Sequence, residues 1–243
     1  NTMATPWLCR PFEWGADLVV HSTTKFLSGQ GNAMGGIVID SGRFPWFGNA
    51  KYPSLSEPSP DYNGLTFAET FGDLAFTLYS HAVSLRDLGC TQSPMNAWIT
   101  LNGVETLPLR MERHVENAQK VAGFLQQHPS VEWVSYAGLS SSPYYQLAQK
   151  YLQGKAGSVF TFGIRGGYES GLRLLEKVEL FSHVSNIGDS RSLILHPAST
   201  THRQLSDEQR LIAGAGPEVI RLSVGIESAE DLIADLEQAL EGL

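Results

Sequence analysis

The stretch from Ala16 to Gly36 constrains the fold of this chain more than any other. It contains a short apolar run at residues 18–20 (LVV), and a second run begins at residues 35–39 (GGIVI). Apolar, β-branched runs of this length, bounded by polar residues and glycines, are typical of buried strands. The residues between the two runs therefore form a polar turn that joins two predicted strands, and this turn carries Lys25.

Lys25 follows three hydroxyl residues, Ser22, Thr23 and Thr24, and precedes Gly29. An amine held at the end of a strand and partly desolvated can lose its proton and attack an aldehyde, while nearby hydroxyls can donate hydrogen bonds to a phosphate. These properties suit a lysine that forms an imine with pyridoxal 5'-phosphate (PLP). The alternative is an exposed loop lysine that is only a solvated charge, and spacing alone favours that alternative.

Composition narrows the class of protein. A chain of 243 residues with 42% apolar content can bury a substantial core in one large domain or two small ones. Its net charge of −8, without a long basic run, argues against a nucleic-acid partner. Cys9 and Cys90 cannot build a disulfide framework and show no zinc-ligand spacing, which fits a reducing cytoplasm. No run has transmembrane length and no signal peptide is recognisable, so we expect no membrane partner.

The first half is expected to continue with a long excursion and then helices. Residues 41–66 are rich in Gly, Pro, Ser and Asn with interspersed aromatics, which is typical of a lid or of a surface excursion packed by its own side chains. Residues 73–88 have helical periodicity. Ser93 and Pro94 form an N-cap and first turn, and an amphipathic helix with a solvated charged face follows Pro108. Gly103 and Pro108 interrupt the helical run and predict a domain boundary near residue 105.

The second half alternates strands with helices, which predicts an α/β domain. The expected strands are 131–135, 159–164, 193–195 and 219–224, and the expected helices are 168–178 and 228–240. Arg221 interrupts the strand 219–224. A guanidinium there either faces solvent on an edge strand or meets an anion, because burying it unpaired is costly. His196 and His202 invite a metal interpretation, but no carboxylate or thiolate matches their spacing, so we expect hydrogen-bonded loop histidines and no metal.

Four sequence blocks carry a resemblance to a known family. They are TPWLCRPFEWGADLVVHSTTKFLSGQGNAMGG, SPMNAWITLNGVETLPLRMERHVENA, IGDSRSLILHPASTTHRQL and VIRLSVGIESAEDLIADLEQAL. In this order they resemble the Cys/Met-metabolism PLP enzymes, which include cystathionine γ-synthase, cystathionine γ-lyase, methionine γ-lyase and the O-acetylhomoserine sulfhydrylases. The resemblance implies the α/β, type I aminotransferase-like fold of PLP-dependent transferases. Residues 1–105 would be the C-terminal part of the large PLP-binding domain, and residues 106–243 the small C-terminal α/β domain.

The resemblance also implies roles for individual residues. Lys25 would be the catalytic lysine that binds PLP covalently, and Ser22 and Thr24 would bind its phosphate. Arg221 and Asn186 would hold the substrate carboxylate, and Thr201 would border the substrate. The position of Asn186 is often Ser in the lyases of the family, and this departure weakens a lyase assignment.

The activity implied by the resemblance is γ-replacement on O-acetyl-L-homoserine by sulfide or a thiol, giving homocysteine or methionine. The long segment 41–66 also favours the O-acetylhomoserine sulfhydrylase branch. The alternatives are a methionine or cystathionine γ-lyase of the same family, and a non-catalytic fragment or assembly partner. Asn1 and Thr2 match the end of the family's Asp-Asn-Thr motif, so an N-terminal remainder of the enzyme is the expected partner. A cytoplasmic homo-oligomer, a tetramer by resemblance, is also expected.

Overall fold

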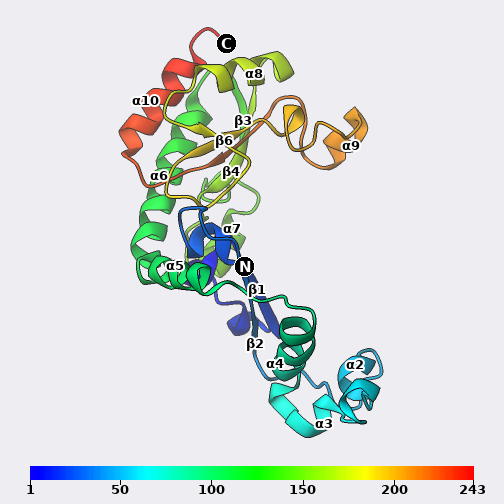
Figure 1. Ribbon diagram of the computed structural model, residues 1–243. Coiled ribbons are helices and arrows are strands. Elements are labelled where there is room, and N and C mark those ends of the chain that lie inside the picture. Colours follow the sequence, from blue (N-terminus) through cyan, green and yellow to red (C-terminus); the bar gives the residue numbers. More distant parts are fainter.

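The computed structural model describes all residues from 1 to 243, and the molecule is elongated (Figure 1). An α/β domain formed by the second half lies at one end, and a helical segment formed by residues 41–92 lies at the other. A two-stranded ribbon and the turn that carries Lys25 lie between them. None of the helices is long and apolar enough to cross a membrane.

The α/β domain is built on a five-stranded sheet in the order β3-β4-β7-β6-β5. The strands are β3 (Val131–Ser135), β4 (Val159–Ile164), β5 (Ser182–His183), β6 (Leu193–Leu195) and β7 (Val219–Ser223). All neighbours pair antiparallel except β5 and β6, which are parallel. The strands predicted at 131–135, 159–164 and 193–195 are confirmed, and the strand predicted at 219–224 ends one residue earlier. The two-residue strand β5 was not predicted.

Three helices cover one face of this sheet and enclose the largest core. They are α6 (Leu107–Gln127), α8 (Gly167–Lys177) and α10 (Ala229–Leu240). Ile220 and Leu222 of β7 are fully buried in this core with Leu125 of α6 and Leu236 of α10. Because side chains alternate along a strand, Arg221 points to the opposite face, away from the helices.

The ribbon consists of β1 (Leu18–Ser22) and β2 (Gly36–Asp40), which pair antiparallel. The prediction of two buried strands is wrong for β2, where Ile37 and Val38 are 46% and 52% exposed, and only partly right for β1, where Val19 is buried but Val20 is 56% exposed. These strands pair only with each other in this chain.

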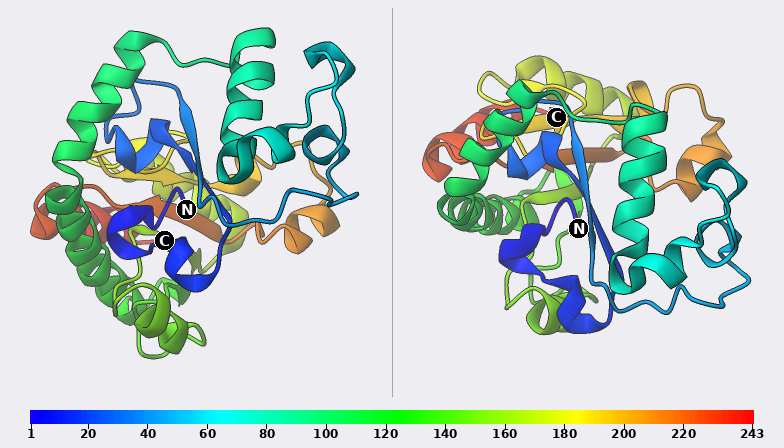
Figure 2. Two further views of the ribbon diagram at one scale, coloured as in Figure 1. Left: turned by 90° about the horizontal axis from the view of Figure 1, so that it is seen from below. Right: turned by 60° about the horizontal axis from the view of Figure 1, so that its bottom comes forward.

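Residues 41–92 fold around a small aromatic core of their own. Its buried members are Trp46, Leu55, Phe67, Ala68 and Ala75. The helical pieces are α2 (Pro53–Ser56), α3 (Phe67–Phe71), α4 (Ala75–Tyr79), 3-10 turns at Pro60–Tyr62 and Gly72–Leu74, and a π-helix at Ser80–Asp87. Both views of Figure 2 show this segment on one side of the molecule and α6 on the other. The predicted excursion 41–66 therefore packs Trp46 and Leu55 against the helices that follow it, and is not held by its own side chains alone.

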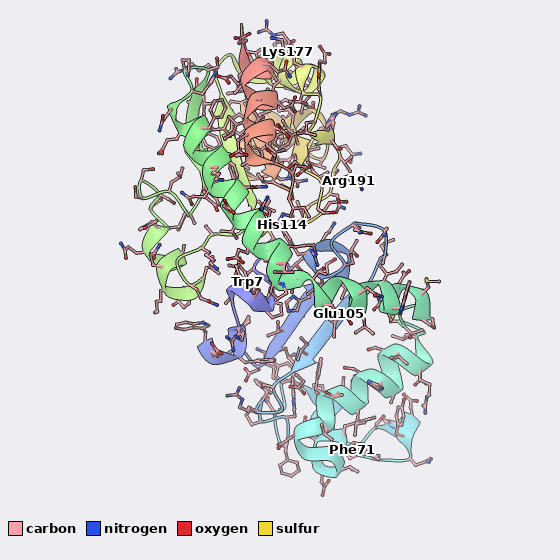
Figure 3. All side chains as sticks on the ribbon, turned by 90° about the vertical axis from the view of Figure 1, so that its left-hand side faces the viewer. Trp7, Phe71, Glu105, His114, Lys177 and Arg191 are labelled. Atoms are coloured by element: carbon pink, nitrogen blue, oxygen red, sulfur yellow. The ribbon has the colours of Figure 1, made fainter.

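The helix α5 (Pro94–Glu105) ends where α6 begins, and Glu105 lies at this junction (Figure 3). As predicted, Ser93 caps α5, with its hydroxyl accepting from the N–H of Asn96 at 3.1 Å. The first turns of α6 pack against Phe26 and Leu27, whereas its later turns enter the core of the α/β domain. One helix ends and the next begins near residue 105, and α6 contributes to the packing on both sides of this point, so the domain boundary there stays a prediction.

The remaining helical elements are short. They are α1 (Thr5–Leu8), α7 (Tyr145–Tyr151), α9 (Asp207–Ile212) and 3-10 turns at Pro11–Trp14 and Pro197–Ser199. A capping box of Ser206 and Gln209 opens α9, with both reciprocal hydrogen bonds formed.

Candidate active site

Lys25 lies in a single π-helical turn, Thr23–Leu27, that directly follows β1; we call it the lysine turn. The backbone of Lys25 departs from helical geometry, with φ −90° and ψ −127°. The N–H of Gly29 donates to the carbonyl of Lys25 at 2.8 Å, and the N–H of Ser28 donates to the carbonyl of Thr23 at 3.0 Å. Gly29 has φ +82°, a conformation that favours glycine, so the chain leaves the turn sharply at this residue.

Three of the predicted site residues meet at Asn186. The Lys25 Nζ donates a hydrogen bond to Asn186 Oδ1. Arg221 Nη2 donates to the backbone carbonyl of Asn186 at 3.2 Å. A Cβ at Gly31 would lie 2.8 Å from Asn186 Nδ2 and 3.2 Å from Asp189 Oδ2, so this close approach requires glycine. The fold therefore brings an amine, an amide and a guanidinium together from two parts of the chain.

Arg221 lies on a central strand. Its neighbours across the sheet are Thr161 of β4 and Leu195 of β6, so the edge-strand alternative is wrong. The side chain is half-buried, makes no ion pair within the chain, and burial lowers its pKa. A desolvated guanidinium with one carbonyl contact retains donors for a bidentate anion such as a carboxylate.

The loop that carries Asn186 is held by hydrogen bonds on both sides. The N–H of Gly188 donates to Ser223 Oγ at 2.9 Å, and the N–H of Ser190 donates to the carbonyl of Gly29 at 2.8 Å. The first bond ties the loop to the strand of Arg221, and the second ties it to the exit of the lysine turn. Glu227 accepts from the N–H of Ser192 at 2.6 Å, which holds the other end of the loop.

The hydroxyls beside Lys25 differ in their availability. Ser22 is half-buried, and its hydroxyl makes no hydrogen bond within the chain. Thr24 Oγ1 accepts from the N–H of Gly35 at 3.1 Å and donates to the carbonyl of Gly35 at 3.3 Å. Thr23 Oγ1 is buried without a partner; the sequence pattern had included this hydroxyl among those beside Lys25, whereas the family resemblance assigned it no role. Ser22 is thus free to bind a ligand, whereas Thr24 is engaged by the backbone.

Thr201 is not brought to this cluster by any contact. It is exposed in the turn after residues 197–199, and its hydroxyl bonds with the Nδ1 of His202 at 2.8 Å. His196 is fully buried and bonds with Ser199 Oγ at 3.0 Å and the carbonyl of Pro217 at 2.8 Å. These contacts agree with the expectation of hydrogen-bonded loop histidines.

Sequence reasoning missed three polar residues of α6 that contact the site region: Arg110, His114 and Asn117. The His114 Nδ1 bonds with the carbonyl of Val224 at 2.7 Å, and its ring packs edge-on against Phe26. Burial lowers the pKa of His114 to about 4, so the ring is neutral. The assignment of all α6 charges to a solvated face is wrong for Arg110, which is half-buried. Spacings of four and three residues place the three on one helix face, and this was the available signal.

Comparisons with known proteins define the class of this chain, which is that of the PLP-dependent enzymes. The family model described as Cys/Met metabolism PLP-dependent enzyme matches residues 1–241, and the chain belongs to this family. The fold is accordingly the type I aminotransferase-like α/β fold, represented by part of the PLP domain and the small domain.

Among similar proteins, an O-acetyl-L-homoserine sulfhydrylase of Leptospira meyeri is 51% identical, covering 100% of this chain and 57% of the relative. O-acetyl-L-homoserine sulfhydrylase 1 of Thermus thermophilus is 50% identical, covering 96% and 55%. A crystal structure from Campylobacter jejuni, described as an O-acetylhomoserine (thiol)-lyase with a pyridoxyl-lysine phosphate, superposes with a TM-score of 0.95 at 44% identity, covering 100% of this chain and 58% of that one. The chain spans somewhat more than half the length of these relatives.

Proposed function

We propose that this chain supplies the lysine and the carboxylate-binding arginine of an enzyme that performs γ-replacement on O-acetyl-L-homoserine, with sulfide or a thiol as the second substrate and PLP as cofactor. The single observation that carries the proposal is the contact of Asn186 with both the Lys25 amine and the Arg221 guanidinium. The names of its relatives give the substrate class.

The residues around Lys25 fit a bound PLP. Lys25 is half-buried on a turn fixed by backbone hydrogen bonds, the Ser22 hydroxyl has no partner within the chain, and the Thr23 hydroxyl is buried and unpaired. We propose that Lys25 holds the aldehyde carbon, that Ser22 donates to the phosphate, and that Thr24 does so after giving up its bond to Gly35. When bound, PLP delocalises the negative charge that develops on the substrate carbons.

Each protein group then has a defined task. The planar guanidinium of Arg221 grips the α-carboxylate of the amino acid through two parallel hydrogen bonds. Asn186 directs the Lys25 Nζ through its side-chain oxygen and positions Arg221 through its carbonyl. Released from the cofactor, the Nζ accepts a proton from one substrate carbon and returns it to another. Acetate leaves from the γ-carbon, and sulfide adds there to give homocysteine. We propose only from the family resemblance that Thr201 borders the substrate.

We further propose that the chain acts with an N-terminal portion like that of its relatives and in a homo-oligomer, a tetramer by resemblance. Large apolar side chains are exposed on α5 and near it, which supports the proposal that another subunit or the N-terminal portion covers this surface. Their exposed fractions are 76%, 62%, 61%, 65% and 73% for Met34, Met95, Trp98, Leu101 and Leu109. Cytoplasmic localisation is proposed from the free thiols of Cys9 and Cys90.

Borohydride trapping of PLP followed by peptide mass spectrometry tests the cofactor assignment. The chain is assayed alone and together with the N-terminal portion of the Leptospira meyeri relative. We expect trapping on Lys25 in the complemented protein and little in the chain alone. Lys25→Ala should abolish trapping, whereas the exposed control Lys51→Arg should leave it unchanged. Trapping at another lysine, or none in the complemented protein, refutes the assignment.

Substrate assays of the complemented protein test the reaction. We expect homocysteine from O-acetyl-L-homoserine and sulfide, and little turnover of methionine alone. Arg221→Lys should raise the KM for O-acetyl-L-homoserine more than it lowers kcat, because a lysine cannot make the bidentate contact. Faster turnover of methionine alone would favour the γ-lyase alternative, and no turnover of either would favour an assembly role.

A further inference from the structure

The side chain of Arg110 reaches from the first turn of α6 to the backbone of the lysine turn. Its Nη1 donates to the carbonyl of Phe26 at 2.9 Å, and its Nη2 donates to the carbonyl of Leu27 at 3.4 Å. The Nη2 also donates to the carbonyl of Gly103 at 2.6 Å, and the Nε donates to Thr106 Oγ1 at 3.2 Å. One guanidinium thus joins the lysine turn to the junction of α5 and α6.

Burying the Arg110 guanidinium in this position costs free energy unless specific interactions compensate it. The residue is half-buried, makes no ion pair, and burial lowers its pKa. A desolvated cation without an acidic partner is tolerated only where hydrogen bonds compensate it, and here carbonyl oxygens do so. The nearby Arg113 shows the usual alternative, since it is about half exposed and lies 3.8 Å from Glu116.

Two glycines make room for the guanidinium and for the helix that it contacts. A Cβ at Gly29 would lie 2.4 Å from Arg110 Nη1, and one at Gly103 would lie 2.3 Å from the carbonyl oxygen of Leu27. The space between the turn and the helices therefore admits a flat group. A planar guanidinium fills it and reaches several carbonyls at once, which a lysine ammonium cannot do.

We propose that Arg110 is a positioning residue for Lys25. It holds the carbonyls of Phe26 and Leu27, the two residues after Lys25, and thereby directs the Lys25 side chain toward Asn186. The proposal rests on the proposed role of Lys25. The last carbonyls of a helical segment lack partners within the segment, and a cation is favourable at that end. Arg110 meets both requirements at the turn from which the reactive amine projects.

The test compares Arg110→Gln and Arg110→Lys with the matched control Arg113→Gln on the same helix. Lysines of the chain, without added cofactor, are dimethylated with ¹³C-formaldehyde, and the Lys25 NMR signal is assigned with Lys25→Arg. We expect a Lys25 signal distinct from those of the exposed lysines in the wild type. In Arg110→Gln the Lys25 signal should merge with the signals of the exposed lysines, and in Arg110→Lys it should lie between those signals and its wild-type position. In Arg113→Gln it should keep its wild-type position.

Hydrogen exchange gives a second measurement. The Gly29 amide, which donates to the carbonyl of Lys25, should exchange about tenfold faster in Arg110→Gln, while amides of β4 keep their protection because the opening is local. A wild-type Lys25 signal and wild-type Gly29 exchange in Arg110→Gln would overturn the proposal, as would an equal change in Arg113→Gln.

The remaining outcomes are also decisive. If Arg110→Gln does not fold, the Arg110→Lys variant tests the proposal. A wild-type Lys25 signal and wild-type Gly29 exchange in Arg110→Lys would show that a single ammonium is enough to hold the lysine turn, and would overturn the proposal. PLP trapping on Lys25 is measured separately. Absence of trapping in the wild type refutes the proposed function, whereas the NMR comparison on the cofactor-free chain judges Arg110 independently.

Discussion

Replacing Gly103 by alanine tests whether α5 is held against the lysine turn as closely as the structure indicates. In a helix interior, glycine to alanine normally stabilises a protein by about 1 kcal/mol, because alanine loses less conformational entropy on folding. At Gly103 the added Cβ would lie 2.3 Å from the carbonyl oxygen of Leu27 and 2.5 Å from that of Ser28. Both obstacles are backbone atoms, so no side-chain rotation relieves them.

The expected size follows from these opposing effects. Moving the helix by about 1 Å costs about 1–3 kcal/mol for overpacking in a close-packed site, and the hydrogen bond from Arg110 to the Gly103 carbonyl, worth about 1.5–3 kcal/mol as a bond from a charged group, is weakened as well. After the gain in helix propensity, we expect a net loss in the free energy of unfolding of about 1–3 kcal/mol.

The matched control is Gly123→Ala in α6. A Cβ at Gly123 meets nothing within 4 Å, so the same substitution should stabilise the chain by about 1 kcal/mol. Urea unfolding of wild type and both variants, followed by tryptophan fluorescence, measures the difference. If Gly103→Ala stabilises the chain as much as Gly123→Ala does, the close approach of α5 to the lysine turn is refuted.

Three further outcomes are expected. The Asp235 carboxylate accepts from the backbone N–H groups of Glu179, Leu180 and Phe181 at 2.8, 2.9 and 3.1 Å, of which the last bond is buried and the other two are partly buried. Asp235→Ala leaves all three without their acceptor and should lower the free energy of unfolding by about 3–5 kcal/mol. Asp235→Asn keeps an acceptor oxygen and should cost less, and equal losses in urea unfolding would contradict this. The pKa of His114 is about 4 in the folded chain, against the ordinary histidine value of 6.5 in the unfolded chain, so the neutral ring contributes its full stability above pH 6.5 and this stability is lost as the pH falls toward 4. Between pH 6.5 and 5, the free energy of unfolding of the wild type should therefore fall by about 1.5 kcal/mol more than that of His114→Gln. Equal declines in the two proteins would show that His114 is not the cause of the pH dependence. Ser206→Ala should destabilise by about 1 kcal/mol, and an unchanged urea midpoint would show that the α9 cap contributes nothing.

Local patterns predicted the elements of the α/β domain well. The strands at 131–135 and 159–164 have the predicted bounds, because short runs rich in β-branched and aromatic residues lie there between clear turn signals. The helix α10 begins one residue after its predicted start, Ser228, whose side chain caps it, and capping is itself local. The family blocks, which run through the whole chain, predicted the fold beyond what periodicity alone provides.

The sequence was less informative where distant segments meet. Lys25 and Asn186 are separated by 161 residues, so their contact follows from tertiary packing, although the family resemblance had assigned both to one site. The position of Arg221 in the middle of the sheet depends on strand order, which a single strand does not encode. Likewise, Arg110 resembles the other charges of α6 until the lysine turn is placed beside it.

The continuous helix α6 has a mechanical consequence for protein engineering. About 22 Å of helix separates Arg110 from Leu125, which is fully buried in the core of the α/β domain. A rod of this length converts a small tilt at one end into a larger displacement at the other. With Arg110 positioning Lys25 as proposed, repacking the core around Leu125 should therefore alter the environment of the Lys25 amine, which Leu125 does not contact.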